Sequence, residues 1–183
     1  MPVRMGGDPK DRRESGSKMI NVIDDALDVS LFQKIQEAFL GDACPWFFSK
    51  GVARQDDGDY QFVHGVYSGS EPASNYWPLA RPVLHVLNAA SVMNIKANLL
   101  VRTKSIVELG MHVDNPLKDA YTAIYYINTN NGHTFFENGT KCESVANRLV
   151  AFPSHMRHGG TTCTDQPTRM LINFNYHPII ENV

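Results

Sequence analysis

Two residues with metal-binding side chains stand two positions apart in the segment 109–116. They are His112 and Asp114, separated by Val113. In an extended strand, side chains two positions apart point to the same face, so an imidazole nitrogen and a carboxylate oxygen can meet one ion. The pattern is weak on its own, because a histidine beside an aspartate is common on protein surfaces. It predicts a metal site only if a third ligand joins it.

The third candidate ligand lies in the segment 152–160, where the end of a strand runs into a turn and a second strand. We choose His158, and His155 is the alternative. The Pro-Ser-x-x-x-His spacing and the glycine pair that follows favour His158. Two imidazoles and one carboxylate on one side of a metal leave its other positions open, as in non-haem Fe(II) oxygenases. A structural zinc site would instead have a closed shell.

An arginine follows eleven residues after His158, at the head of the alternating segment 169–176. The period of two in a strand puts two sets of side chains on opposite faces. One face carries Arg169, Leu171, Asn173 and Asn175, and the other carries Met170, Ile172, Phe174 and Tyr176. An arginine inside a barrel is costly unless it meets an anion, and its planar fork matches a carboxylate. Arg169 therefore predicts a buried anion site.

Together these motifs resemble the Fe(II)/2-oxoglutarate-dependent dioxygenases, and within them the prolyl-4-hydroxylase-like branch. The family pattern is His-x-Asp, then a Gly-x-Thr-x-Phe-like strand, then Phe-Pro-Ser-x-x-x-His, and an arginine farther on. The matching segments here are 112–114, 132–136, 152–158 and Arg169. The resemblance covers roughly residues 95–177.

The resemblance implies a fold and a reaction. The fold would be mainly β with N-terminal helices, a double-stranded β-helix, also described as a jelly roll or cupin-like barrel. His112, Asp114 and His158 would hold Fe(II), and Arg169 would bind the far carboxylate of 2-oxoglutarate. With O2 as the other co-substrate and ascorbate as a candidate reductant, such an enzyme hydroxylates an organic substrate and releases succinate and CO2. Its substrate would be a small molecule or a prolyl or other peptidyl residue.

The chain departs from the family at one position. Many members carry a Ser or Thr two residues after the arginine, where this chain has Leu171. We expect Tyr125 or Tyr121, on the preceding strand, to supply the missing hydroxyl to the co-substrate. Asn173 faces the same interior and is a candidate to bind water or co-substrate.

The elements that must position these residues fall into two halves. In the first half, residues 20–23 read as a short strand, and residues 30–40 have apolar residues at helical spacing, ended by Gly41. Residues 78–90 suggest a second helix. Residues 42–78 have many aromatic residues and no clear period, so we expect a covering loop region.

From Ser91 onward the sequence is of β type. The expected strands are residues 95–107, 121–127, 133–136, 149–152 and 170–176. Without alternating helices to connect parallel strands, these predict an antiparallel sandwich or barrel, with the N-terminal helices packed outside. We expect one oxygenase domain over 19–183, with helical support in 19–92 and the β core in 93–178, after a disordered arm in 1–18.

The composition limits the possible partners and the cellular location of the protein. The chain has 183 residues, 43% of them hydrophobic, which is enough for a core without disulfides. Lys and Arg number 17 against 19 Asp and Glu, so no global basic field predicts nucleic acid or an anionic membrane as partner. Three cysteines, an odd count without a CxxC pair, indicate a reducing, cytoplasmic location. No segment is long and apolar enough to span a bilayer.

Two other functions remain open. A cupin-like metal enzyme that does not use 2-oxoglutarate would share the barrel and the histidines but would have no use for Arg169. A non-catalytic binding barrel would keep the fold without an active metal. The intact set of three ligands and the arginine favour the oxygenase, although the motifs identify the oxidant and not the substrate.

Overall fold

The computed structural model describes residues 20–54 and 56–179, so the expected arm at residues 1–18 lies outside the described residues. The described elements follow in this order: β1 (Asn21–Ile23), α1 (Val29–Leu40), β2 (Phe47–Lys50), β3 (Tyr60–Ser68), β4 (Glu71–Pro72), α2 (Trp77–Val86), β5 (Ala89–Val101), β6 (Tyr121–Tyr126), β7 (His133–Phe136), β8 (Lys141–Glu143), β9 (Leu149–Pro153), β10 (His158–Gly160) and β11 (Thr168–Pro178).

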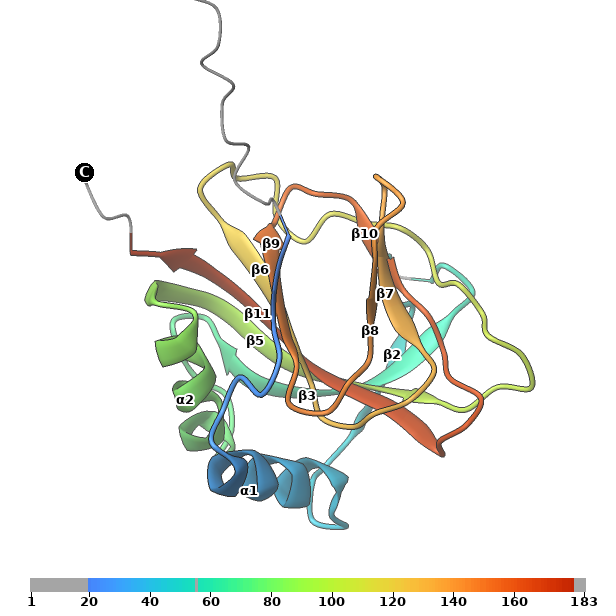
Figure 1. Ribbon diagram of the computed structural model, residues 1–183, viewed down its shortest axis with the longest axis horizontal. Coiled ribbons are helices and arrows are strands. Elements are labelled where there is room, and N and C mark those ends of the chain that lie inside the picture. The colour runs from blue at the N-terminus through green and yellow to red at the C-terminus, as the bar shows by residue number, and fades with distance from the viewer. Residues whose placement is uncertain (1–19, 55, 180–183) are drawn as a thin grey trace, which may run out of the picture.

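Two antiparallel sheets form the barrel (Figure 1). The major sheet has the strand order β1-β9-β6-β11-β5-β3-β2, with β4 paired to β3. The minor sheet has the order β10-β7-β8. Strands that are distant in sequence are neighbours, since β11 lies between β5 and β6. This mainly antiparallel architecture, with two helices outside it, is the jelly-roll fold expected from the sequence.

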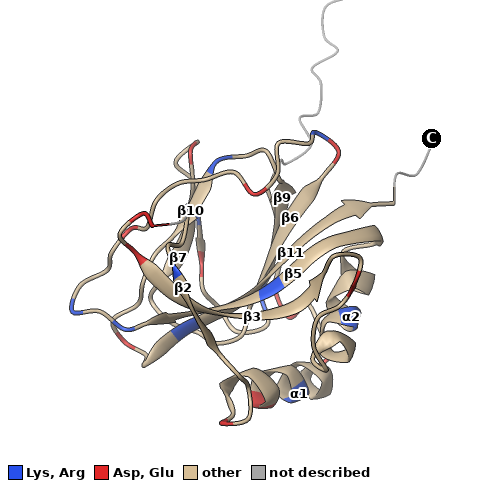
Figure 2. Ribbon diagram, turned by 180° about the vertical axis from the view of Figure 1, so that it is seen from behind, with Lys and Arg blue, Asp and Glu red and all other residues tan. Residues whose placement is uncertain are grey.

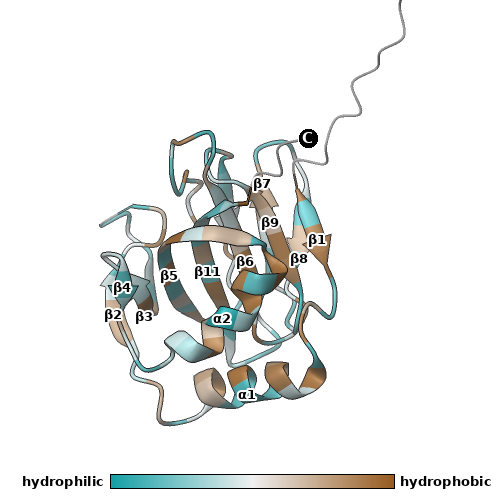
Figure 3. Ribbon diagram, turned by 90° about the vertical axis from the view of Figure 1, so that its left-hand side faces the viewer, coloured by the Kyte–Doolittle hydropathy of each residue, from teal (hydrophilic) through white to brown (hydrophobic). Residues whose placement is uncertain are grey.

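The major sheet separates two apolar cores. On its outer face α1 and α2 pack against the strands, as the side view of Figure 3 shows. That core includes Phe39 of α1, Val83 of α2 and Ile172 of β11. A second, smaller core lies between the two sheets and joins Phe152 of the major sheet to Phe136 of the minor sheet. The functional side chains share the inner space with this second core.

The first helix forms where the apolar period predicts it. Its buried residues are Ile35 and Phe39, one turn apart on one face. The N-cap is Asp28, whose carboxylate accepts a hydrogen bond from the backbone N–H of Ser30 at 2.9 Å. The helix ends before Gly41, as expected.

The expected covering loop at residues 42–78 is wrong, because this region contributes β2, β3 and β4 to the major sheet. The strand signal was hidden for two reasons. A bulge between Gly65 and Tyr67 shifts the register of β3 against β5, which breaks the period of two. Some buried positions of β3 are also polar, Gln61 and His64, so the strand lacks a continuous apolar face. The three-residue strand β8 also gave no readable period, whereas β10 is the second strand expected after the turn in 152–160.

Charges are interspersed over the strands, loops and helices rather than gathered on one element (Figure 2). This agrees with the near-balanced composition of the chain. Neither described helix is long and apolar enough to cross a membrane.

Candidate metal centre and its cavity

Backbone pairing brings the two candidate histidine ligands together. His112 and His158 form an isolated antiparallel bridge beside β10. The N–H of His112 donates to the carbonyl of His158 at 2.8 Å, and the N–H of His158 donates back at 3.0 Å. Directly paired residues project their side chains to the same face, and the two ring centroids are 4.6 Å apart. A contact between residues 46 positions apart thus places two imidazoles side by side.

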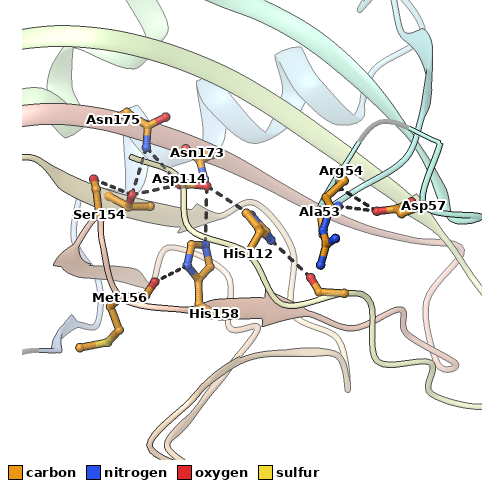
Figure 4. Close-up of polar contacts among 12 residues, drawn as sticks. Ala53, Arg54, Asp57, His112, Asp114, Ser154, Met156, His158, Asn173 and Asn175 are labelled. Carbon is orange, nitrogen blue, oxygen red and sulfur yellow. Dashed lines mark hydrogen bonds and ion pairs between the residues drawn. The ribbon is translucent and has the colours of Figure 1, made fainter. Parts of the chain in front are cut away.

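Asp114 completes a cluster with these histidines (Figure 4). Its Oδ1 lies 3.2 Å from His112 Nε2 and 3.8 Å from His158 Nε2. One ligand atom from each of the three residues lies within 4.8 Å of the others, the separation expected around a single ion. We call these three residues the His-Asp-His cluster. The alternative ligand His155 is exposed on the turn before β10 and is not part of it.

Neighbouring side chains hold the carboxylate in place. Asp114 Oδ2 accepts hydrogen bonds from Thr122 Oγ1 at 3.0 Å, Asn173 Nδ2 at 3.1 Å and Asn175 Nδ2 at 3.0 Å. Ser154 Oγ lies 2.9 Å from the same threonine hydroxyl. These donors fix one oxygen and leave Oδ1 facing the two imidazoles, as the hydrogen-bond partners of metal-binding carboxylates do.

The imidazoles are oriented by backbone carbonyls. His158 Nδ1 lies 3.0 Å from the carbonyl oxygen of Met156, and His112 Nδ1 lies 3.4 Å from that of Gly110. An N–H at Nδ1 would leave Nε2 of each ring free to bind a metal, and these are the nitrogens that face Asp114.

The protonation states suit a metal site. Burial alone would raise the pKa of Asp114, but the hydrogen bond with His112, the charge of His158 and the two asparagine amides together lower it below its usual range. Burial lowers the pKa of His158, partly opposed by Asp114. Burial is also the largest influence on the pKa of His112 and acts to lower it, but the hydrogen bond with Asp114, the charge of Asp114 and the hydrogen bond with the Gly110 carbonyl together raise it. An ionised carboxylate beside a neutral His158 provides the ligand forms that divalent metals require.

Arg169 lies in the same cavity, with a relative accessibility of 1%. Its Nε donates to Ser144 Oγ at 2.8 Å, and its Nη2 donates to Thr134 Oγ1 at 3.2 Å. The guanidinium carbon lies 5.6 Å from the ring centroid of Tyr126. Burial lowers the pKa of Arg169. Among the described residues no carboxylate forms an ion pair with it, so its charge is held by neutral groups and is available to an anion.

Two glycines leave room around this arginine. A Cβ on Gly132 would lie 2.6 Å from Arg169 Cδ, and a Cβ on Gly160 would lie 3.2 Å from its Nη1. The first distance excludes a larger side chain, and the second would crowd the nitrogen that has no hydrogen bond to a described residue. The cradle therefore suits a guanidinium together with a small anion.

The rest of the cavity wall combines polar and apolar side chains from several strands. Its remaining lining residues are Val52, Gln61, Asn94, Lys96, Asn98, Leu100, Leu109, Ile124, Thr134, Gly159, Gly160, Leu171, Asn173 and Asn175. The alternation expected for β11 is confirmed, because its odd-numbered residues from 169 to 175 line the cavity and its even-numbered residues join the outer core.

The tyrosine hypothesis needs correction. Tyr121 and Tyr125 lie on the outer face of β6, toward the helices, and neither lines the cavity. The hydroxyl of Tyr125 donates to Asn147 Oδ1 at 2.7 Å. The inward residue of this strand end is Tyr126, whose hydroxyl donates to Thr134 Oγ1 at 2.7 Å and so joins the surroundings of Arg169.

Asn173 faces the interior, as predicted, but its amide is engaged by Asp114 rather than directed at a co-substrate. The sequence analysis assigned no functional role to four other interior residues: Thr122, Asn175, Lys96 and Asn98. Asn175 was already assigned to the inner face of β11, so its strand phase was the available signal. Thr134 stood within the Gly-x-Thr-x-Phe-like motif, which was the signal for a hydroxyl beside Arg169.

The sequence of residues 100–177 matches a family model described as the 2OG-Fe(II) oxygenase superfamily. No curated protein matches the chain.

Solved structures share the fold at low sequence identity. A prolyl-4-hydroxylase from Pseudomonas putida is 15% identical, with a TM-score of 0.56 and coverage of 87% of this chain and 92% of that one. A prolyl hydroxylase from Trichoplax adhaerens, in complex with a peptide fragment of the hypoxia inducible factor oxygen degradation domain, is 14% identical, with a TM-score of 0.56 and coverage of 86% and 83%. The epimerase SnoN, in complex with Fe3+, alpha ketoglutarate and nogalamycin RO, is 10% identical, with a TM-score of 0.59 and coverage of 87% and 78%.

Proposed function

We propose that His112, Asp114 and His158 bind Fe(II) and that Arg169 binds the far carboxylate of 2-oxoglutarate, because residues 100–177 match the 2OG-Fe(II) oxygenase superfamily. The family uses Fe(II), 2-oxoglutarate and O2. The observation that carries the assignment is that one cavity contains both the His-Asp-His cluster and a buried arginine without a carboxylate partner among the described residues.

The residues present fit the cofactor. Two imidazole nitrogens and one carboxylate oxygen form the donor set that non-haem Fe(II) oxygenases use, with positions left open for other ligands. The space left by Gly132 and Gly160 around the guanidinium suits the second carboxylate of a dicarboxylic acid.

When bound, Fe(II) and 2-oxoglutarate would let O2 act as the oxidant: one oxygen atom of O2 enters succinate as 2-oxoglutarate loses CO2, and the other becomes available to the substrate. The protein positions the groups and controls their surroundings. Asn173 and Asn175 hold Asp114 with Oδ1 toward the imidazoles. Arg169 fixes the co-substrate at its far end, and the apolar side chains of Leu109, Ile124 and Leu171 limit water in the cavity.

For the substrate, we propose hydroxylation of an organic compound, with a prolyl or other peptidyl residue as the leading candidate. The prolyl hydroxylases that share the fold support this choice, and the peptide bound to one of them supports a peptidyl target. A small-molecule substrate is the second candidate, supported by the nogalamycin compound bound to SnoN. We also propose a cytoplasmic location, supported by three free, buried cysteines.

Anaerobic titration of the Fe(II)-loaded protein with 2-oxoglutarate tests the assignment. We expect the weak visible metal-to-ligand charge-transfer band to appear in the wild type. In Arg169→Ala we expect half-saturation to need at least tenfold more 2-oxoglutarate, since a lost charge-assisted pair costs on the order of 1.5–3 kcal/mol.

The control is Arg102→Ala, which removes an exposed arginine after β5 that does not line the cavity. It should leave the titration unchanged. A wild-type protein that holds Fe(II) but gives no band and no 2-oxoglutarate affinity would favour the cupin-like enzyme that does not use 2-oxoglutarate.

A further inference from the structure

A second basic side chain lines the cavity besides Arg169. Lys96 lies on β5, four residues before Leu100, which is paired with Arg169 of β11. Each strand residue advances by about 3.3 Å, so the backbone positions of the two cations are about 13 Å apart along the sheet. Lys96 is itself paired with Asn173, which binds Asp114. The backbone positions of the two cations therefore lie at opposite ends of the cavity, and Lys96 is at the end near the His-Asp-His cluster.

Lys96 has no dedicated carboxylate partner within the described part of the chain, where no ion pair involves it. Burial lowers the pKa of Lys96, and the charge of Asp114 partly opposes this effect. That carboxylate is already engaged, since three hydrogen bonds reach Oδ2 and Oδ1 faces the two histidines. An ammonium group held half-buried is unfavourable unless an anion compensates it.

The route into this end of the cavity is also basic. A surface groove shares Val52, Gln61 and Lys96 with the cavity and adds Lys50 and Arg54. Among the described residues that line this groove, none is acidic. A path lined by charges of one sign raises the local concentration of ligands with the opposite sign.

One acid of the loop between β2 and β3 is turned back into the loop itself, whereas Asp56 and Asp59 line an adjacent pocket together with Ala53 and Arg54. Asp57 accepts hydrogen bonds from the backbone N–H groups of Ala53 at 2.8 Å and Arg54 at 2.9 Å, as Figure 4 shows. Its charge is therefore used to hold the loop between β2 and β3 and does not neutralise the groove.

From this arrangement, we propose that Lys96 determines substrate specificity by pairing with an acidic group of the substrate, a carboxylate or a phosphate. The inference rests on the proposed function, because it leaves Arg169 to 2-oxoglutarate. Asn98 adds a second feature, since its Oδ1 is buried without a hydrogen-bond partner in the part of the chain that the structure describes, and it lies two positions from Lys96 on the same face of β5. The substrate site thus offers a cation for an oxyanion and an acceptor for an N–H or O–H donor.

Probe binding tests the proposal without a known substrate. The zinc-substituted protein is saturated with 2-oxoglutarate, and line broadening is then measured for acetate by proton NMR and for inorganic phosphate by phosphorus NMR. We expect broadening for at least one anion and none for the neutral probe acetamide. The broadening should fall at least fivefold in Lys96→Met and be retained in Lys96→Arg and in Lys104→Met, a control at an exposed lysine outside the cavity.

Equal broadening in the wild type and Lys96→Met, or none for either anion in the wild type, would overturn the assignment of Lys96. The charge-transfer titration with Fe(II) separates this failure from failure of the proposed function. A band in the wild type that is absent from Lys96→Met would place Lys96 with the co-substrate and also overturn the proposal. Absence of the band from the wild type itself would instead reject the proposed function.

Discussion

At the residue scale, the centre depends on side chains that do not belong to the His-Asp-His cluster. Asn173 and Asn175 both donate to the oxygen of Asp114 that faces away from the imidazoles. Loss of such an outer partner commonly weakens metal binding by 10–100-fold, because the ligand loses its orientation and its charge loses support. We therefore expect the inner face of β11 to contribute to metal affinity at the proposed site without supplying a ligand.

Asn175→Ala tests this role. We expect metal affinity to fall by about 10–100-fold, measured by competition with a chromophoric chelator. Asn94→Ala is the matched control, because Asn94 is paired with Asn175 across β5 and β11 and lines the same cavity but donates no hydrogen bond to Asp114. Equal losses in both variants would mean that the effect comes from general disruption of the cavity wall.

Gly160→Ala tests the space beside the arginine. The added methyl group would lie 3.2 Å from Arg169 Nη1, so we expect 2-oxoglutarate to bind several-fold more weakly while metal affinity is retained. The charge-transfer titration measures the first quantity and chelator competition the second. Gly65→Ala serves as control, since its nearest contact would be an ordinary 3.8 Å from Ala73 Cβ. Unchanged 2-oxoglutarate affinity in Gly160→Ala would show that the ligand does not use this side of the guanidinium.

At the scale of the elements, the direction of side chains could be predicted only on strands whose polar and apolar residues alternate. On β11 polar and apolar residues alternate, so the sequence alone assigned Arg169 and Asn173 to one face. On β6 nearly every residue is buried, because one face meets the helices and the other meets the inner core. A strand buried on both faces has no alternation that reveals its inner side. The choice of Tyr121 and Tyr125 failed for this reason, and Tyr126 was the inward tyrosine.

Tyr125→Phe tests whether Tyr125 faces the helices, as in the structure, or the cavity, as the sequence analysis expected. Its hydroxyl bonds Asn147, which also bonds the backbone of Leu27 on the segment before α1. We expect a loss of about 1 kcal/mol in the free energy of unfolding, measured by denaturant titration, and no change in 2-oxoglutarate affinity. Tyr121→Phe, without a hydroxyl hydrogen bond to any described residue, is the control. Weaker 2-oxoglutarate binding in Tyr125→Phe would restore the original hypothesis.

At the scale of the whole molecule, the sequence indicated a β barrel with outer helices and most strands after Ser91. It also indicated the three ligands of the His-Asp-His cluster and the buried anion site at Arg169. It did not indicate that β2 and β3 extend the major sheet, because the bulge after Gly65 disrupts the only local signal. Nor could it indicate that Lys96 and Asn98 face the cavity, since that depends on which side of β5 the helices cover. Long-range pairing, and not local period, determines both features.

Metal binding should stabilise the whole fold. The cluster joins segments that are distant in sequence, so a metal that binds the folded chain adds about 2.7 kcal/mol at one hundred times its dissociation constant. For a chain of this size we expect the melting temperature to rise by roughly 5–10 °C. Thermal melts with and without Mn(II) measure the shift, and His158→Ala should abolish most of it. A similar shift in that variant would place the stabilising metal elsewhere.

The two faces of β11 also affect how the substrate specificity of such a barrel can change during evolution. Ile172 and Phe174 pack beneath the helices, while Leu171 and Asn173 face the cavity. Substitutions on the cavity side can alter what is recognised without opening voids in the helix-packed core, so drift toward a new substrate need not reduce folding stability. Mutational libraries confined to Leu171 and to the inner face of β5 should therefore yield mostly folded variants, a practical starting point for directing this scaffold toward other substrates.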